Sequence, residues 1–291
     1  MKVRVAILKA FGKTARGGNL AGVVVGSNKF NRAQMQRIAK KVGYSETAFI
    51  YKKSDRVFNI RYFTPTKEVS LCGHATIAAF SHLYIQGSVK VGHYQLKTKA
   101  GLLDITVKRG GIILMSQVKP IYSELVSTKE LAGALRIPEH KLAVGGLLPQ
   151  IVSTGGRDIM VPIKSRRLLF SLKPNFRALA RISKKTKSIG FQVFTFDTLQ
   201  KKAAAHCRNF APWYGINEES ATGSSAGALG SYLFKYFQVP QRRALRLVFE
   251  QGYSMQKPSE ILVELETKNH KVVRVKVGGG AILVKALSYD V

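Results

Sequence analysis

The chain has 291 residues, of which 45% are hydrophobic and 22% are charged. This composition predicts a folded globular protein of one or two domains with substantial apolar cores. No apolar run approaches the roughly 20 residues that cross a bilayer, and the first residues alternate like a strand. We therefore expect no signal peptide, no membrane partner and a cytoplasmic location. Two cysteines are too few for a disulfide framework, so both are expected as free thiols.

Lysine and arginine outnumber aspartate and glutamate by 47 to 16, which gives a formal net charge of +31. Such a surface should attract polyanions in a salt-dependent way. The basic residues are scattered in pairs, and the chain lacks a recognised nucleic-acid-binding motif. We interpret the charge as a solvated basic surface with nonspecific polyanion association. A dedicated nucleic-acid site is the alternative.

The first half of the chain predicts several strands around one helix rich in small residues. Strands are expected over residues 3–8 and 23–25, and Asn31 can cap a helix that ends at Gly43. A second helix is expected from Gly73 to about Tyr84. Further predicted strands cover residues 44–51, 57–63, 94–96, 102–107 and 112–115.

The second half is expected to repeat this organisation after a crossover that begins at Pro120. Predicted helices cover residues 128–135, residues from 176 to before Gly190, and residues from 223 to about 237. Predicted strands lie in a β-turn-β region from Ala143 to Ile163 and over residues 191–196, 246–250, 261–266, 272–277 and 281–287.

Four residues of the first half recur at a fixed offset of 147: Gly43, Arg61, Phe63 and Pro65 are matched by Gly190, Arg208, Phe210 and Pro212. A glycine-led helix of small residues then follows in each half. This repetition predicts two similar α+β domains. Their expected limits are residues 1–117, completed by a C-terminal strand at 278–291, and residues 118–277.

Glu46 is the leading candidate for chemistry. The offset places it opposite Val193, so the first copy has a carboxylate where the second accepts an apolar residue. We predict that Glu46 is partly desolvated, that desolvation raises its pKa, and that it takes and returns a proton. An exposed glutamate at a strand end is the alternative.

The helix that starts at Gly73 should offer backbone N–H groups and the positive end of its dipole to an anion. His74 could donate to a substrate or hold Glu46 in place, or it could be a histidine satisfied by backbone. Glu219 is a second carboxylate candidate, with a solvated loop charge as its alternative. Cys72 aligns with Thr222, which cannot act as a second thiol in a two-thiol racemase.

The spacing of histidines and cysteines predicts no metal site, because Cys72 with His74 and His206 with Cys207 lack further ligands at diagnostic distances along the chain. Dinucleotide-binding, phosphate-loop and nucleophile-elbow motifs are also absent from the sequence.

Four groups of segments resemble the signatures of the PhzF-type phenazine-biosynthesis-like isomerases. They occur in the family's order over nearly the whole chain: Gly18–Val23, Ser45–Phe49, Phe63–Pro65 with Leu71–Thr76, and Ala221–Ser224. The resemblance implies a diaminopimelate-epimerase-like fold. In that fold two similar domains are related by a pseudo-twofold duplication, each a curved, mostly antiparallel sheet around a central helix. An active site in the cleft between the domains and a homodimer are also implied.

The resemblance further implies isomerisation of a small carboxylic acid without a cofactor or metal, in which the residue matching Glu46 moves the proton. The expected catalytic residues are Glu46, His74 and Glu219, and the expected substrate-binding residues are Asn19, Ser45, Gly73, Thr222, Gly223 and Ser224. Two positions depart from the family pattern, since Leu20 replaces proline and Glu219-Ser220 replaces Asp-Pro. A catalytically silent metabolite- or nucleic-acid-binding protein on the same scaffold is the alternative.

Overall fold

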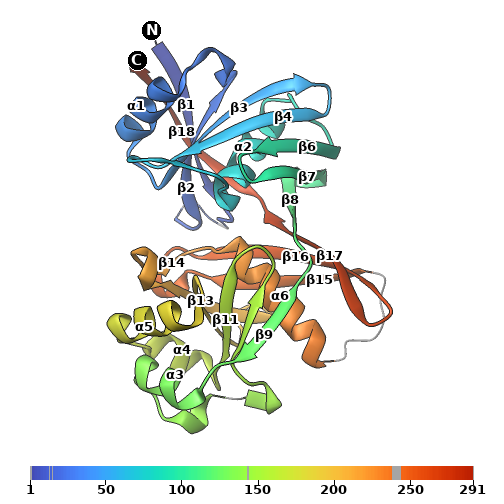
Figure 1. The fold of residues 1–291 in the computed structure, drawn as a ribbon. Helices are drawn as coiled ribbons and strands as arrows, with labels where there is room; N and C mark the ends of the chain where they lie inside the picture. Colours follow the sequence, from blue (N-terminus) through green and yellow to red (C-terminus); the bar gives the residue numbers. More distant parts are fainter. Residues whose placement is uncertain (1, 13, 15, 143, 238–243, 291) are drawn as a thin grey trace. The chain divides into compact units, whose positions relative to one another are not determined.

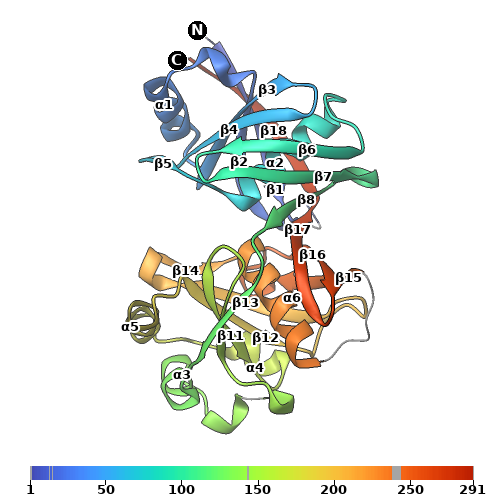
Figure 2. The ribbon, with the colours of Figure 1, turned by 45° about the vertical axis from the view of Figure 1, so that its right-hand side comes forward.

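The computed structural model describes residues 2–12, 14, 16–142, 144–237 and 244–290. The chain divides into two compact units, residues 1–116 with 278–291 and residues 117–277. Each unit is a curved sheet with one helix packed inside it, α2 in the first and α6 in the second (Figure 1; Figure 2). Among the described residues, no helix is both long and apolar enough to cross a membrane.

The first unit is a mostly antiparallel sheet with the order β18-β1-β2-β3-β4-β6-β7-β8, and β5 lies beside β4. Among the described residues of this unit, the parallel pairs are β2–β3 and β4–β6. The strands are β1 (Lys2–Ala10), β2 (Asn19–Val25), β3 (Glu46–Ser54), β4 (Val57–Phe63), β5 (Glu68–Val69), β6 (Gly92–Thr98), β7 (Gly101–Lys108), β8 (Ile112–Gln117) and β18 (Ala281–Asp290), and the helices are α1 (Arg32–Val42) and α2 (Gly73–Ile85).

The central helix α2 is buried because it has no polar stripe. Eight of its 13 residues are buried, including the run from Ala75 to Ser81, and a helix that is largely apolar on all sides belongs in a core. The Tyr62 hydroxyl lies 2.6 Å from Thr76 Oγ1. The Thr76 hydroxyl in turn donates to the Cys72 carbonyl at 2.7 Å. These two bonds anchor the first turn of α2 to strand β4.

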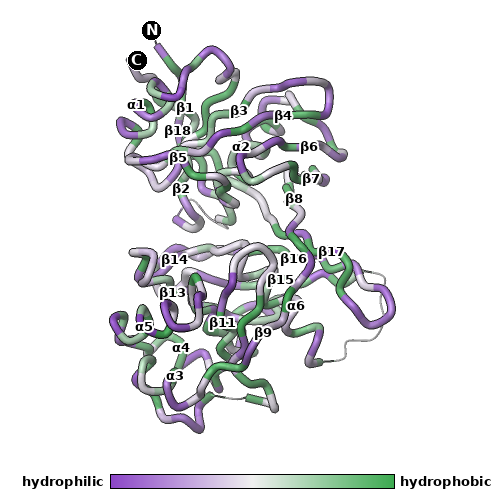
Figure 3. The backbone as a smooth tube through the Cα atoms, viewed as in Figure 1, coloured by the Kyte–Doolittle hydropathy of each residue, from purple (hydrophilic) through white to green (hydrophobic). Residues whose placement is uncertain are grey.

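Helix α1 packs on the same sheet through one apolar stripe. Its hydropathy alternates along the helix (Figure 3), and the buried residues are Met35, Ile38, Ala39 and Val42. Asn31 and Gln34 form a reciprocal capping box, and Gly43 ends the helix in the left-handed conformation. The predicted limits of α1 are therefore confirmed.

The second unit repeats the arrangement with the order β9-β10-β11-β12-β13-β15-β16, and β14 lies beside β13. The parallel pairs are again the equivalent ones, β11–β12 and β13–β15. The strands are β9 (Ile121–Leu125), β10 (Gln150–Ser153), β11 (Arg157–Pro162), β12 (Gly190–Thr195), β13 (Ala205–Ala211), β14 (Ile216–Glu219), β15 (Ala244–Gln251), β16 (Ser259–Lys268) and β17 (Lys271–Gly279), and the helices are α3 (Thr128–Leu135), α4 (Arg166–Ser171), α5 (Phe176–Thr186) and α6 (Gly223–Phe237).

Four elements of the second unit were not expected, namely β9, α4, β13 and β14, and in the first unit the short strand β5 was not expected either. The helices at 128–135, 176 onward and 223–237 agree with the predictions. Ala143, the first residue of the predicted β-turn-β region, lies outside the described residues, and its strands are β10 and β11.

The strand registers correct one step of the sequence alignment. Phe49 pairs with Arg61 in the first unit, and Val193 pairs with the equivalent Arg208 in the second. Phe49 therefore corresponds to Val193, and Glu46, three residues earlier, corresponds to Gly190. The predicted match of Glu46 with Val193 is wrong because the β12–β13 connection is three residues longer than the β3–β4 hairpin.

The same three-residue shift shows that the predicted match of Gly43 with Gly190 is also wrong. Gly43 ends α1 with φ 72°, and the residue that ends α5 in the same left-handed conformation is Lys187, with φ 51°. Gly190 instead begins β12, where a Cβ would lie 2.7 Å from the Phe210 carbonyl oxygen. Close backbone packing thus explains this glycine.

Candidate active site

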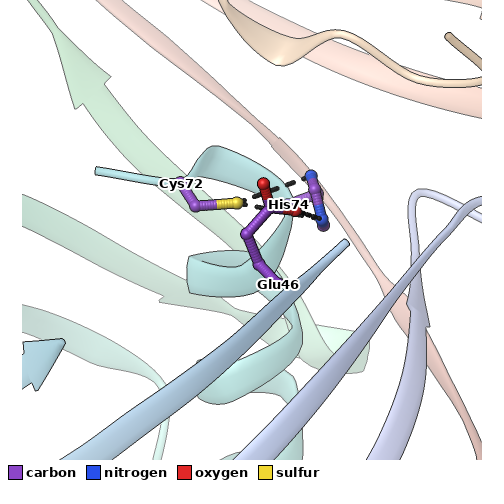
Figure 4. A group of neighbouring side chains, drawn as sticks. All are labelled: Glu46, Cys72 and His74. Atoms are coloured by element: carbon purple, nitrogen blue, oxygen red, sulfur yellow. Dashed lines mark hydrogen bonds and ion pairs between the residues drawn. The ribbon is translucent and has the colours of Figure 1, made fainter. Parts of the chain in front are cut away.

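Glu46 lies where strand β3 starts beside the first turn of α2. It is the first residue of β3 and pairs with Ala21 of the parallel strand β2. Its Oε2 atom lies 3.0 Å from Nε2 of His74, the second residue of α2. The Glu46 side chain is 20% exposed and that of His74 is 11% exposed, so the pair is largely but not completely shielded from solvent. Figure 4 shows both side chains turned toward each other.

Ser45 and Cys72 complete the surroundings of the imidazole. Ser45 Oγ lies 3.4 Å from His74 Nε2 and also 3.4 Å from the Leu20 carbonyl oxygen. Cys72 Sγ lies 3.6 Å from Nδ1 and 3.8 Å from Nε2 of the same ring (Figure 4). The imidazole is therefore surrounded by a carboxylate, a hydroxyl and a thiol.

The electrostatics of the pair differ from the prediction. Burial raises the pKa of Glu46, but the close contact with the His74 imidazole and its charge outweigh burial, so the pKa of Glu46 lies below its usual value. The expected rise in the pKa of Glu46 is wrong because the sequence did not reveal this partner's effect. Burial lowers the pKa of His74, while Cys72 and Glu46 raise it, and the result lies well above the usual value.

Burial is the largest influence on the pKa of the Cys72 thiol, and it raises that pKa. A protonated thiol carries no charge, so we attribute the raised pKa of His74 chiefly to the Glu46 carboxylate. Near neutral pH the cluster therefore holds a carboxylate at Glu46, an imidazolium at His74 and a neutral thiol. Glu46 is in the form that accepts a proton.

The start of α2 is suited to an anion. Its first turn contains no acidic residue of its own, and the first N–H groups of any helix lack intrahelical partners. A Cβ at Gly73 would meet only Met115 Cε, at 3.8 Å. Packing among the described residues therefore does not demand glycine here, and the missing side chain leaves the backbone approachable by a ligand.

In the second unit, Glu219 and Thr222 lie together just before α6. Thr222 Oγ1 donates to Glu219 Oε2 at 2.9 Å. Gln251 Nε2 donates to the Glu219 carbonyl at 2.8 Å and to Thr222 Oγ1 at 3.0 Å. Gln251 belongs to no sequence motif, and its position beside these residues depends on the pairing of β15 with β13.

The remaining predicted residues lie at the ends of elements. Gly223 and Ser224 begin α6, where the Ser224 carbonyl accepts a hydrogen bond from Thr154 Oγ1 at 3.2 Å. Asn19 begins β2 and pairs with Ala10. The structure thus brings Ser45, Glu46, Gly73 and His74 together in the first unit and Glu219, Thr222, Gly223 and Ser224 together in the second.

A buried acid near α6 was also missed. Asp158 is 2% exposed, and its Oδ2 accepts a hydrogen bond from Ser225 Oγ at 2.7 Å. Burial raises the pKa of Asp158 to about 6. The available signal was a single acid at the start of the apolar stretch Asp158–Pro162.

One cluster has the donor atoms of a metal site. A carboxylate oxygen of Glu46, the Cys72 sulfur and a His74 ring nitrogen all lie within 4.8 Å of one another. The sequence predicted no metal site because Glu46 belongs to a strand distant from the other two residues along the chain.

Solved structures of an epimerase and of a PhzF-family protein share this fold. A crystal structure of a hydroxyproline epimerase from Agrobacterium vitis shares the fold, with a TM-score of 0.62 at 11% identity over 99% of this chain and 92% of that chain. The Bacillus anthracis phenazine biosynthesis protein of the PhzF family matches with a TM-score of 0.91 and 28% identity, and both chains are covered completely.

Residues 8–286 match the family described as phenazine biosynthesis-like protein, PhzC-PhzF. A protein from Clostridium acetobutylicum named as an uncharacterized isomerase is 34% identical over 95% of this chain and 94% of its own length. The chain belongs to the PhzF family. The resemblance and the predicted α+β fold class are confirmed, and the named relatives support an isomerase in general.

Proposed function

We propose that the protein is a cofactor-independent isomerase that moves a proton on a small carboxylic acid, with Glu46 as the acid/base residue. The observation that carries the proposal is the ionised carboxylate of Glu46, which is 20% exposed and lies 3.0 Å from His74. His74 is the second residue of helix α2. A carboxylate that is partly accessible can reach a substrate, and one that is partly shielded transfers protons without competition from bulk water.

Substrate binding begins with the substrate carboxylate at the first turn of α2. The N–H groups of Gly73 and His74 and the helix dipole favour a negative charge there. The imidazolium of His74 adds a charged donor beside the same position. Asn19 and Ser45, at the adjoining ends of β2 and β3, are proposed to bind the polar groups of the substrate.

Proton transfer then follows from the ionisation of the pair. Glu46 takes a proton from a carbon that is adjacent to the substrate carboxylate or conjugated with it, and the bonding electrons delocalise toward that carboxylate. The positive helix end and His74 stabilise the charge that develops. Glu46 returns the proton to another carbon, so the enzyme ends each turnover in its starting state.

The second unit is proposed to supply the other substrate contacts through Thr222, Gly223 and Ser224, with Glu219 sharing hydrogen bonds with the bound molecule. This part rests on the family resemblance and on the hydrogen bond that fixes Glu219 against Thr222. Because a displacement near 1 Å can cost about 100-fold in rate, Glu219→Asp should change kcat/KM measurably. An unchanged kcat/KM would remove Glu219 from the proposal.

The deciding experiment is proton exchange in heavy water. Small carboxylic acids are incubated with the protein in deuterium oxide, and deuterium incorporation at carbon is followed by NMR. The expected result is enzyme-dependent exchange into at least one acid, with a new isomer formed. Binding of an acid without exchange would favour the catalytically silent metabolite-binding alternative.

The charge of +31 favours a second candidate, a nucleic-acid-binding protein on this scaffold. Tight binding with sequence or structure preference at physiological salt would support it. The nonspecific association that we expect should instead weaken steeply as salt rises. The homodimer also stays a prediction, and analytical ultracentrifugation tests it.

A further inference from the structure

We propose that Glu46, Cys72 and His74 form a binding site for a thiophilic divalent cation such as Zn²⁺, in which the ion acts as an inhibitor of the enzyme. The three side chains converge from the start of β3 and the start of α2, both within the first unit (Figure 4). Their ligand atoms all lie within 4.8 Å of one another.

The distances are close to those that zinc imposes on its ligands. At bond lengths of about 2.3 Å to sulfur and about 2.0–2.1 Å to nitrogen and oxygen, a tetrahedral ion holds a sulfur and a nitrogen about 3.6 Å apart and a nitrogen and an oxygen about 3.3 Å apart. His74 Nε2 lies 3.8 Å from Cys72 Sγ and 3.0 Å from Glu46 Oε2. These two distances differ from the zinc values by only a few tenths of an ångström, so a rotation of the imidazole with small shifts of the other side chains would admit the ion.

The hydrogen bonding of the cluster also leaves ligand capacity available. Although Oε2 of Glu46 is close to the imidazole, it is buried and makes no well-directed hydrogen bond to the described residues. The sulfur is nearly equidistant from both ring nitrogens of His74, at 3.6 and 3.8 Å. The ring must therefore turn for the Nε2 lone pair to point at an ion shared with the sulfur.

The donor set selects the kind of ion. Thiolate and imidazole ligands favour Zn²⁺ and Co²⁺, whereas Mg²⁺ and Ca²⁺ prefer oxygen ligands. On binding, the Cys72 thiol releases its proton to solvent and a sulfur–metal bond forms. His74 likewise binds through its neutral imidazole, so its proton is also released. Thiolate and carboxylate then offset the two charges of the ion, and a fourth position stays open to water, as in catalytic zinc sites.

Proton release makes the binding depend on pH. Each proton that must leave a ligand raises the apparent affinity about tenfold per pH unit until that ligand is deprotonated. A site built from carboxylates alone would show no such dependence near neutral pH.

Inhibition is the part of this inference that rests on the proposed function. A metal-bound Glu46 carboxylate is a weaker base toward the substrate proton, because the ion withdraws electron density from it. A metal-bound His74 has likewise lost the proton that supports the substrate carboxylate. Zinc should therefore stop the exchange reaction, and a chelator should restore it.

The test uses Co²⁺ as a spectroscopic substitute for zinc on the full-length protein without substrate. We expect one Co²⁺ per chain, with sulfur-to-cobalt charge-transfer absorption in the near ultraviolet and the strong visible bands of tetrahedral coordination. Addition of Zn²⁺ should displace the cobalt, and Mg²⁺ should not. Absence of the charge-transfer absorption would overturn the proposal.

Variants assign the ligands. Cys72→Ser should abolish the charge-transfer absorption, and Glu46→Gln and His74→Gln should each weaken binding by at least about 100-fold, because loss of even an outer partner typically costs 10–100-fold. Cys207→Ser is the matched control, since Cys207 is the other free, buried cysteine and lies in the second unit. An undiminished absorption in Cys72→Ser, or its loss in Cys207→Ser, would contradict the assignment.

Two readouts separate this inference from the isomerase proposal. Cobalt binding needs no substrate, so its failure leaves the proton-exchange result untouched. If Cys72→Ser fails to fold, as judged by circular dichroism, Glu46→Gln and His74→Gln still decide whether the site exists. If exchange occurs and zinc binds but does not inhibit it, the inhibitory role is wrong.

Discussion

The two units have the same arrangement of strands and central helix, but the acid near the helix start is partly exposed in one unit and buried in the other. In the first unit Glu46 starts β3 and faces the first turn of α2, where it stays 20% exposed beside His74. In the second unit the equivalent of Glu46 is Gly190, and the acid near α6 is Asp158 on the neighbouring strand, 2% exposed and bonded to Ser225. The two units thus share a glycine-led helix start, whereas the acid nearest to it is partly exposed in one unit and buried in the other, at positions that do not correspond.

The two units share an arginine–glutamate pair that stabilises the fold. Arg61 and Arg208 each form paired hydrogen bonds with a glutamate, Glu68 or Glu218. Each guanidinium also lies over an aromatic ring, at 5.2 Å from the Phe63 centroid and 4.9 Å from the Phe210 centroid. A contact present in both copies is explained by folding, so the groups that differ between the units are the better candidates for chemistry.

The largest expected effect comes from removing the acid that only the first unit has. Glu46→Gln keeps the shape of the side chain but cannot take a proton, so turnover should fall by about 10²–10⁴-fold. Kinetics of deuterium exchange measure the loss, and circular dichroism checks the fold. Glu124→Gln, a 58% exposed carboxylate in the second unit, is the control and should keep full activity. Full turnover by Glu46→Gln would exclude the mechanism.

The shared arginines should differ in their contribution to stability. Arg208 is 9% exposed and also donates to the carbonyls of Leu169 and Leu172, so Arg208→Met should cost about 3–5 kcal/mol. Arg61 is 35% exposed, and its partner Glu68 keeps ion pairs with Arg32 and Lys99. Arg61→Met should therefore cost only about 1–2 kcal/mol.

Urea unfolding measures this difference. The single tryptophan, Trp213, lies in the second unit, so its fluorescence reports there, and far-ultraviolet circular dichroism reports on both units. Equal losses for the two variants would mean that the extra contacts of Arg208 add nothing.

The buried acid of the second unit should make stability depend on pH. Burial raises the pKa of Asp158 from 3.8 to about 6, so the unfolded chain ionises this group more readily than the folded protein does. This contribution is absent below about pH 4, it destabilises the fold increasingly as pH rises from about 4 to about 6, and above that it levels off at about 3 kcal/mol at most.

Asp158→Asn removes the ionisation. The variant should gain stability relative to the parent protein at pH 8, and the gain should disappear near pH 4, as measured by urea unfolding across that range. The exposed Asp104 supplies the control Asp104→Asn, which should show no such trend. A gain independent of pH would show that ionisation of Asp158 is not the cause.

The sequence predicted those parts of the fold whose signals are local. Asn31 and Gly43 bound α1 through capping chemistry, and the glycine-led run at Gly73 fixed the start of α2. Helix α4 was not predicted because its six residues are too few to display a helical period. Its cap, in which the Ser165 side chain accepts from Leu168 N–H, is also common in turns.

The site was predicted less completely because it depends on long-range register. The motifs selected Glu46 and His74, but the equivalence of Glu46 with Gly190 follows only from strand pairing across loops of different length. The lowered pKa of Glu46 depends on an imidazole 3.0 Å away, which linear spacing does not report. Asp158 was missed for the same reason, since burial of one acid is a property of the assembled sheet.

The smallest expected effect compares the caps of the equivalent helices α1 and α5. Asn31 accepts from Gln34 N–H at 3.0 Å while Gln34 accepts from Asn31 N–H at 2.9 Å, whereas Asn175 makes only the forward bond to Ala178 N–H, at 3.1 Å. Asn31→Ala should therefore cost about 1–2 kcal/mol and Asn175→Ala about 0.5–1 kcal/mol in urea unfolding. If the reciprocal bond causes the difference, Gln34→Ala should destabilise the parent protein more than it destabilises Asn31→Ala, because the two residues act as one unit. If the losses of stability from Asn31→Ala and Gln34→Ala simply add, the reciprocal bond between these two residues does not explain the difference between the caps.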